Sequence, residues 1–198
     1  MPEFSRLTLP SSDIQLEFVE REQTPCELMR LSIHLHLAGL SLSDTVHVLE
    51  RFGVDRARST VHNWVQKAEL QPEDGKSPDH VAVDETATQL TDDRYWLFAA
   101  VDPETKGLTG IFLDELSEKH DVGDAVFLVD SADWLKAALH RRGYEFQYER
   151  HGQRNSIERV FKEVKRRTYQ FGNCFRNADP ETAETWLQSL AYCWNRLI

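Results

Sequence analysis

The chain has 198 residues, 40% of them hydrophobic, which excludes a disordered protein and allows one medium domain or a small domain beside a medium one. Its 33 acidic and 23 basic residues give a net charge of −10, which taken alone argues against a nucleic-acid partner. The charges are unevenly spread, because residues 73–133 hold 16 acids and 4 bases whereas residues 141–168 hold 9 bases and 4 acids. A basic segment therefore follows an acidic one.

The basic residues are 16 Arg and 7 Lys. Excess surface acid with Arg preferred over Lys suits a very salty cell interior, where salt screens the repulsion between an acidic protein and DNA. The plainer interpretation is an acidic cytosolic protein that never meets DNA.

Cys26, Cys174 and Cys193 are too scattered to predict a disulfide framework or a zinc site. No signal peptide or membrane-spanning run is visible, so we expect a cytoplasmic protein without membrane contact.

Residues 1–23 are polar and predict an N-terminal arm, and residues 24–70 predict three helices. The first helix opens at Thr24-Pro25, and the second opens with a capping box from Ser41 to Asp44. Asp55 is positioned to cap the third. Two short helices joined by a turn with Gly53, the second polar and basic outside, are typical of a helix-turn-helix that reads the major groove. Its predicted DNA contacts are Arg56, Arg58, Ser59, His62, Asn63, Gln66 and Lys67. The alternative is a plain three-helix bundle with a solvated polar face.

Residues 71–79 combine Pro, Gly and charge and predict a linker, so residues 80–198 would form a second domain. There the hydrophobic period predicts an α/β fold. The first expected elements are a strand from residue 80 that ends near Asp84, a hairpin to a strand at 94–102, and a helix at 108–120. They are followed by a buried parallel strand at 124–130 and a helix at 132–142 that is capped by Asp130 or Ser131. The last expected elements are a strand at 144–148, a loop at 151–154, a helix at 155–168 and a helix at 180–197.

The predicted helix at residues 155–168 combines a buried stripe with a basic surface and one acid. Ile157, Val160, Phe161 and Val164 recur at helical spacing. Glu158 lies in the first turn. The predicted contacts to nucleic-acid phosphates are Arg154, Arg159, Lys162, Lys165 and Arg166.

Asp84 and Asp130 each follow an apolar strand-like run. If these strands are adjacent and parallel, both carboxylates project at one end of the sheet, and Glu158 can lean over that end. Three converging carboxylates repel one another unless cations lie between them, and oxygen-only ligands favour Mg²⁺ or Mn²⁺. Two such ions would clamp the attacking and leaving oxygens of a phosphoryl displacement. We therefore expect Asp84, Asp130 and Glu158 to be metal ligands and catalytic residues.

Each acid also has a structural interpretation. Asp84 can simply bound a strand, and Asp130 can cap a helix. Glu158 stands at capping-box spacing from Asn155, and it also stands four residues before Lys162. Only the combination of the three acids favours the metal site.

Several motifs resemble one family along nearly the whole chain: DET after a strand, FLVDSA, HGQRNSIERVFKEVKRRT, NCF and the terminal WLQSLAYCWN. The chain resembles DDE transposases of insertion-sequence family 6, especially the acidic members of salt-loving archaea. The resemblance implies an RNase H-like catalytic domain with Asp84, Asp130 and Glu158 as its metal-binding triad. It also implies double-stranded DNA partners, cleavage at terminal inverted repeats, joining of the freed 3′-hydroxyls to target DNA, and at least a homodimer.

The interval from Asp84 to Asp130 departs from the family pattern because it spans only 46 positions. Five residues, 103–107, separate the second strand from the predicted helix, where an RNase H-like fold has a third, antiparallel edge strand. The sequence therefore predicts an internal deletion that removes this strand and leaves the second strand as an exposed edge.

The sequence is compatible with three functions. The first is an active transposase that cleaves and joins DNA strands. The second is a catalytically impaired descendant that acts only as a helix-turn-helix DNA-binding protein or repressor, which the short interval favours. The third is an unrelated α/β phosphotransferase or nuclease, against which the helix-turn-helix pattern and the missing phosphate loop argue.

Overall fold

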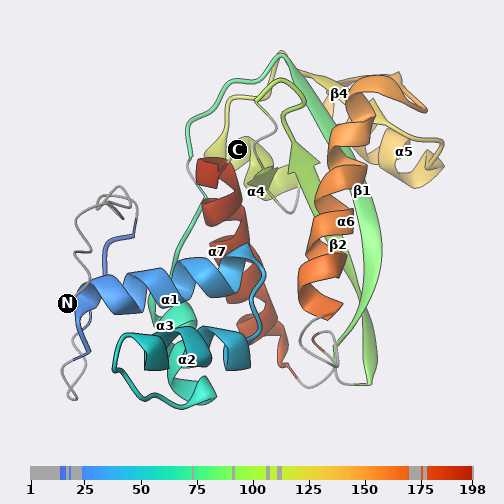
Figure 1. Cartoon of the computed structure of the whole chain (residues 1–198). Coiled ribbons are helices and arrows are strands. Elements are labelled where there is room, and N and C mark those ends of the chain that lie inside the picture. Colours follow the sequence, from blue (N-terminus) through green and yellow to red (C-terminus); the bar gives the residue numbers. More distant parts are fainter. Residues whose placement is uncertain are drawn as a thin grey trace.

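The chain forms an α/β structure in which helices cover both faces of a twisted mixed sheet (Figure 1). This computed structural model describes residues 14–16, 18, 24–72, 74–90, 92–105, 108–110, 113–169, 175 and 178–197. Most of the predicted arm at residues 1–23 therefore lies outside the described residues, as does Cys174. Cys26 is partly buried and Cys193 is buried.

The three predicted N-terminal helices are present as α1 (Cys26–Ala38), α2 (Leu42–Arg51) and α3 (Arg58–Lys67). The predicted cap of α2 is confirmed, because the Ser41 hydroxyl accepts a hydrogen bond from the Asp44 N–H at 3.1 Å. The predicted cap of α3 is wrong. Its N-cap is Ala57, which has no side-chain oxygen, and Asp55 lies too far ahead of the first turn.

The sheet has five strands in the order β3-β2-β1-β4-β5. They are β1 (His80–Leu90), β2 (Asp93–Val101), β3 (Leu108–Gly110), β4 (Val126–Val129) and β5 (Glu145–Tyr148). β1 pairs antiparallel with β2 and parallel with β4, and β4 pairs parallel with β5. The prediction that β1 and β4 are parallel neighbours is confirmed. The predicted end of β1 near Asp84 is wrong, because β1 continues to Leu90 in an unbroken antiparallel ladder with β2.

The predicted loss of the third strand is also wrong. β3 pairs antiparallel with β2 at the edge of the sheet, and the expected helix at residues 108–120 is instead β3 followed by α4 (Leu113–Lys119). Asp102 explains how so few residues suffice. It is buried, its Oδ1 accepts the Glu104 N–H at 2.9 Å, and its Oδ2 accepts the Thr105 hydroxyl at 2.7 Å. These bonds close a tight turn that returns the chain to the edge of β2.

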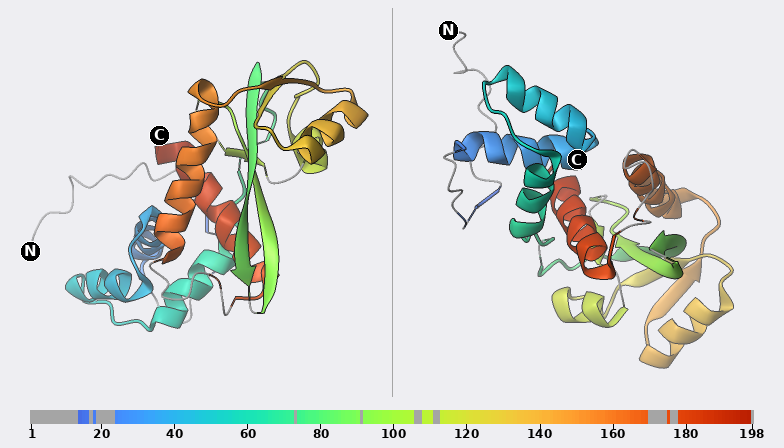
Figure 2. Two further views of the ribbon diagram at one scale, coloured as in Figure 1. Left: turned by 90° about the vertical axis from the view of Figure 1, so that its right-hand side faces the viewer. Right: turned by 90° about the horizontal axis from the view of Figure 1, so that it is seen from below.

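Helices α6 (Asn155–Tyr169) and α7 (Pro180–Leu197) lie on one side of the sheet, and α4 and α5 (Asp133–Arg142) lie on the other (Figure 2). Each face of the sheet buries its own cluster of side chains. On one face Val83, Phe127 and Val129 pack with α4 and α5. On the other, Ala82, Ala99 and Leu128 pack under α6 and α7. Successive side chains of β1 point to opposite faces, so Val81 and Val83 enter one cluster and Ala82 enters the other.

The N-terminal helices belong to the same cluster as α6 and α7. Ile33, Leu49 and Trp64 are fully buried in it. Hydrogen bonds add to this packing: the Gln66 amide donates to the Thr182 carbonyl at 3.4 Å, and the Gln71 amide donates to Gln188 Oε1 at 2.7 Å. Helix α7 therefore joins the N-terminal helices to the sheet. Among the described residues, no helix is long and apolar enough to cross a membrane.

Candidate functional site

Asp84 lies where β1 separates from β4. The parallel pairing ends with Ala82 opposite Leu128, and Asp84 is the next residue of β1 on the face that α6 covers. With its β4 neighbour gone, the Asp84 side chain faces the space between the strand and α6, and only 18% of it is exposed.

Asp130 directly follows β4 and is anchored by one of its two carboxylate oxygens. Asp130 Oδ1 accepts the Ala132 N–H at 2.8 Å, which shapes the turn before α5. The N-cap of α5 is Ala132, without a side-chain cap, so neither Asp130 nor Ser131 caps this helix as predicted. Asp130 Oδ2 is left to face the cluster, where it lies 3.5 Å from Arg154 Nη2.

Arg154 lies at the centre of the three acids. It ends a single 3-10 turn, η1 (Gly152–Arg154), that leads directly into α6. Its Nη2 lies 2.7 Å from Asp84 Oδ2, and its Nη1 donates to Glu158 Oε1 at 3.2 Å. Acids from β1, from the end of β4 and from α6 thus converge on one guanidinium, as the sequence predicted they would converge on one point.

The structure places Glu158 on Arg154, one helical turn earlier, and not in a capping box with Asn155. Arg154 itself was predicted to contact DNA, but it is only 6% exposed and its guanidinium is directed at the acids. The sequence carried one signal for this pairing, the spacing of four residues between Arg154 and Glu158.

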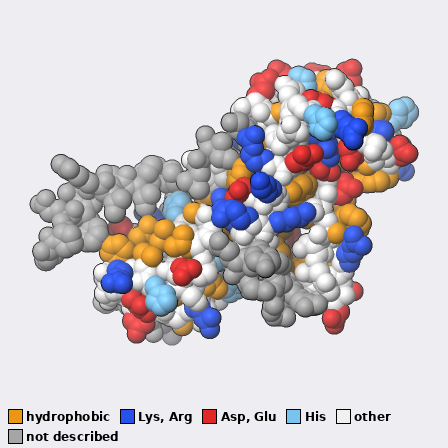
Figure 3. Space-filling model, turned by 45° about the vertical axis from the view of Figure 1, so that its right-hand side comes forward, with side chains coloured by type: hydrophobic (Ala, Val, Ile, Leu, Met, Phe, Trp, Pro, Cys, Tyr) orange, Lys and Arg blue, Asp and Glu red, His pale blue; other side chains and the backbone are white. Residues whose placement is uncertain are grey.

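Helix α6 presents its predicted buried stripe and basic surface. Ile157, Val160, Phe161 and Val164 are buried against the sheet and α7. Figure 3 shows Lys and Arg side chains gathered over the middle of one face of the molecule. The other predicted phosphate contacts on α6 are all exposed: Arg159, Lys162, Lys165 and Arg166. Of these, Arg166 already bonds within the helix, donating to Glu163 Oε2 at 2.9 Å.

A pocket of about 390 Å³ opens between β1 and α6 beside the acids. Asp84 and Glu158 line it together with Lys162 and Lys165. It therefore offers carboxylates and two ammonium groups to one bound molecule. A metal-assisted reaction at a phosphate needs both, since the cations hold the polyanion while the acids hold the metal.

Two neighbouring acids of β1, Asp84 and Glu85, have raised pKa values. Burial raises the pKa of Asp84, and nearby Asp130 adds to this increase, while Arg154 and the Glu85 N–H oppose it. The pKa of Glu85 is also raised, first by burial and then by Asp84 and Asp130. Sequence reasoning did not select Glu85, although it follows Asp84 directly. Glu85 lines the same pocket as Asp84 and Glu158, which makes it a fourth carboxylate beside this site.

The acids at this site fit a hard divalent cation, since Asp84, Asp130 and Glu158 would all offer carboxylate oxygens as ligands. Within the described residues, however, no three acidic, histidine or cysteine side chains already stand at metal-binding spacing. The acids are arranged around a guanidinium, with N–O distances of 2.7–3.5 Å, and not around a smaller ion. Their chemistry suits a metal ion, and their present spacing suits Arg154.

The other predicted DNA contacts lie on α3, apart from Arg56 just before it, and they fall into two groups. Arg58, Ser59, Asn63 and Lys67 are exposed on the outer surface. The remaining three, Arg56, His62 and Gln66, are partly buried. The Arg56 Nε donates to the Thr24 hydroxyl at 2.9 Å, and Gln66 is bound to α7, so these two side chains also hold the helices together.

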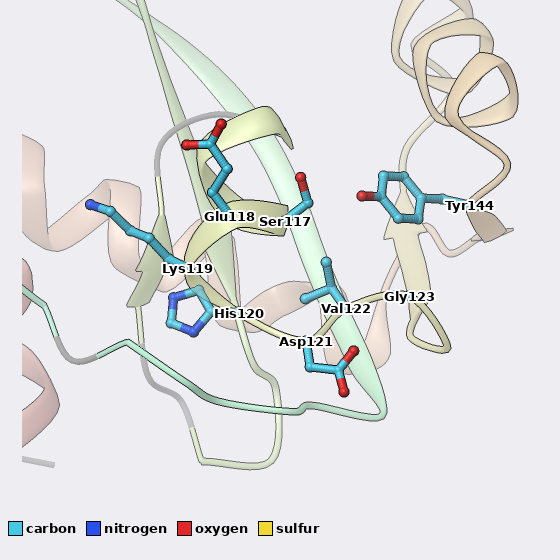
Figure 4. Close-up of a pocket in the computed structure, with 8 residues that line it drawn as sticks. All are labelled: Ser117, Glu118, Lys119, His120, Asp121, Val122, Gly123 and Tyr144. Carbon is cyan, nitrogen blue, oxygen red and sulfur yellow. The ribbon is translucent and has the colours of Figure 1, made fainter.

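A second pocket, of about 520 Å³, lies at the carboxyl end of α4 (Figure 4). Tyr144 directs its hydroxyl across it toward Ser117. Beside it the linker is fastened to the sheet domain, because the Gly75 N–H donates to the Lys119 carbonyl at 2.7 Å and the Lys76 N–H donates to His120 Nδ1 at 3.2 Å. None of the predicted catalytic residues lines this pocket.

Comparison with known proteins identifies a relative along most of the chain but no family. No protein-family model matches the sequence. Over 197 residues the chain is 26% identical to "Uncharacterized protein MJ0017" of Methanocaldococcus jannaschii, and the match covers 92% of each protein. The similarity therefore extends over both the N-terminal helices and the sheet.

Proposed function

We propose that this chain is a DDE transposase that binds the terminal inverted repeats of an insertion sequence and catalyses DNA cleavage and strand transfer. The observation that carries this proposal is the convergence of Asp84, Asp130 and Glu158, from three separate elements, beside a pocket lined by Lys162 and Lys165. The third strand removes one argument against activity. β3 lies antiparallel at the edge next to β2, where an RNase H-like fold has its third strand, so its presence supports that fold.

In this proposal the three acids hold two Mg²⁺ or Mn²⁺ ions, which when bound would stabilise the charge on the attacking and leaving oxygens. Lys162 and Lys165 hold the DNA backbone at the rim of the pocket, where their charge neutralises phosphates. The first nucleophile is a water molecule, and the second is the 3′-hydroxyl that the first step releases. A dimer or larger assembly would hold two element ends together.

Helices α2 and α3 would supply sequence recognition as a helix-turn-helix. The Gly53 backbone has a φ of +77°, which closes the turn between them. Asn63 is exposed at the middle of α3, and the exposed Arg58 and Ser59 stand in its amino-terminal half. In a helix-turn-helix this half of the second helix meets the base edges. The acidic surface elsewhere makes binding depend on salt that screens the repulsion between protein and DNA.

The test uses labelled DNA from the two ends of the element that encodes the chain, incubated with the protein and Mn²⁺ at high salt. We expect nicks at the element ends, and we expect Asp84→Asn, Asp130→Asn and Glu158→Gln to abolish them while DNA binding remains. Glu118→Gln is the matched control, because Glu118 is an exposed acid beside the second pocket. Nicking by the Asp130→Asn protein would refute the proposed site.

A second candidate function is a DNA-binding repressor that occupies the inverted repeats without cutting. The observation that favours it is the Arg154 guanidinium, which already occupies the acid cluster. Sequence-specific binding without nicking under any metal condition would support this function over the first.

A further inference from the structure

Arg154 is the only cationic side chain recorded in ion pairs with the three acids in the described part of the chain. Its two terminal nitrogens serve three carboxylates, because Nη2 lies near both Asp84 and Asp130 and Nη1 near Glu158. Only 8% of its side chain is exposed. A buried arginine of this kind is stable only when carboxylates surround it, and the acids in turn need a cation between them.

One positive charge does not balance three negative ones. Asp84 and Asp130 also share a single nitrogen of this guanidinium, at 2.7 and 3.5 Å. The guanidinium is also imperfectly bonded. Its Nε is buried and meets no acceptor among the described residues. A guanidinium normally engages carboxylates through its whole planar fork, so this arrangement leaves bonding capacity unused.

The backbone that carries Arg154 is held independently of its guanidinium. The Gln153 N–H donates to Glu149 Oε1 at 3.0 Å, and Gly152 adopts a φ of +85°, where a Cβ would overlap the Glu149 carboxylate. These features fix η1 ahead of α6. The long Arg154 side chain can therefore change rotamer and leave the acids while the turn and the helix stay in place.

We propose that Arg154 is the resident counter-cation of the acid cluster, and that its guanidinium and divalent metal ions exclude each other there. The acids now stand 2.7–3.5 Å from guanidinium nitrogens, whereas Mg²⁺ requires oxygens at about 2.0–2.1 Å. An ion bound by the same oxygens would overlap the guanidinium, and the two cations would repel. Arg154 is thus a positioning residue, which keeps the acids gathered until metal replaces it. This inference rests on the proposed function in one respect, the choice of a divalent ion such as Mg²⁺ or Mn²⁺ as the competing cation.

The test compares the affinity for Mn²⁺ of the metal-stripped wild-type protein and of Arg154→Gln, by titration calorimetry. We expect Arg154→Gln to bind Mn²⁺ at least tenfold more tightly, because no competing cation remains. Arg154→Lys, which keeps the charge but has a single nitrogen, should fall between the two. Arg150→Gln is the matched control, since it makes the same charge change at an exposed neighbouring residue, and it should alter the affinity less than twofold.

Thermal unfolding provides the second measurement. Without metal, Arg154→Gln should melt below the wild type because its acids repel one another, and Mn²⁺ should raise its Tm by more than it raises that of the wild type. A purely structural arginine would lower the Tm equally with and without Mn²⁺, which would overturn the inference. If Arg154→Gln does not fold, the test rests on Arg154→Lys, which should bind Mn²⁺ more tightly than the wild type.

The outcomes separate this inference from the proposed function. Equal Mn²⁺ affinity in the wild type and in both Arg154 variants would overturn the competition and leave the metal site intact. Weaker binding by Arg154→Gln would overturn it too. Failure of every protein to bind Mn²⁺ would refute the metal-dependent function itself, and the inference with it.

Discussion

The indole N–H of Trp186 in α7 donates a hydrogen bond to Nε2 of His36 in α1 at 3.3 Å. His36 Nδ1 lies 2.9 Å from the Leu40 carbonyl, to which it can only donate. The ring must therefore be neutral, with its proton on Nδ1, to satisfy both contacts. Burial lowers the pKa of His36 from its ordinary value of 6.5 to about 4, the Leu40 carbonyl opposes this, and His62 adds to it.

The first prediction follows from this neutral histidine. The folded state takes up a proton only near pH 4, whereas the unfolded state takes it up near pH 6.5, so stability is complete above pH 6.5 and falls as the pH drops toward 4. At 1.36 kcal/mol per pKa unit, the loss is about 3 kcal/mol. Urea unfolding of the wild type and of His36→Gln should reveal this loss. The difference between their free energies of unfolding should shrink as the pH falls from 6.5 to 4. Parallel stability curves would contradict the prediction.

A second prediction concerns the continuous core. Trp64 of α3 is fully buried in the cluster that α6 and α7 share, so Trp64→Ala should lower the free energy of unfolding by about 3–5 kcal/mol. Its matched control is Trp96→Ala, because Trp96 is 55% exposed and should cost less than about 1 kcal/mol.

Because the cluster is continuous, far-UV circular dichroism and tryptophan fluorescence should report a single unfolding transition in the wild type. Two separated transitions, with only the first moved by Trp64→Ala, would show that the N-terminal helices unfold on their own.

The third prediction concerns recognition by α3. Asn63 is exposed on this helix, where an amide can read an adenine edge. Asn63→Ala should weaken binding to the inverted repeat by roughly 1–3 kcal/mol and leave binding to unrelated duplex DNA unchanged. Fluorescence anisotropy with both duplexes measures the ratio. An equal loss on both would place Asn63 outside base recognition.

The fourth prediction separates phosphate contact from base recognition. Lys165 is exposed on α6 at the rim of the pocket, so Lys165→Gln should weaken binding to every duplex alike. The slope of log affinity against log salt should fall by about 1, the value expected for one lost phosphate contact. Lys119→Gln is the control, since Lys119 lines the second pocket. An unchanged slope in Lys165→Gln would exclude this contact.

Local signals predicted most of the fold. The Ser41 cap, the helix from Pro180 to Leu197 and the parallel pairing of β1 with β4 follow from capping chemistry and from the hydrophobic period. The third strand could not be predicted in this way. β3 has three residues, too few for a period, and it is recognised only by its pairing with β2. The bonds of the buried Asp102 carboxylate to residues 104 and 105 are likewise a property of the folded chain.

The candidate site was predicted only in part, because local sequence patterns indicate where elements lie but not how deeply a side chain is buried. Asp84 stands just past the end of the pairing between β1 and β4, Asp130 directly follows β4, and Glu158 lies in the first turn of α6, so the topology brings the three acids to one region. The role of Arg154 depends on how deeply its side chain is buried, and burial is a property of the packed fold that no local pattern records. Its basic neighbours on α6 made a phosphate contact the simpler prediction.

The joint between α7 and the N-terminal helices has a consequence for the DNA. Because α3 is bound to α7 through Gln66, and α7 shares a core with α6, α3 and the acid cluster are held in one packed unit. In the proposed transposase each protomer would therefore hold its DNA-recognition site and its cleavage site at a fixed distance. The number of base pairs between the sequence that α3 reads and the bond that is cut would then be fixed, and inserting half a helical turn of DNA between them should prevent cleavage while recognition persists.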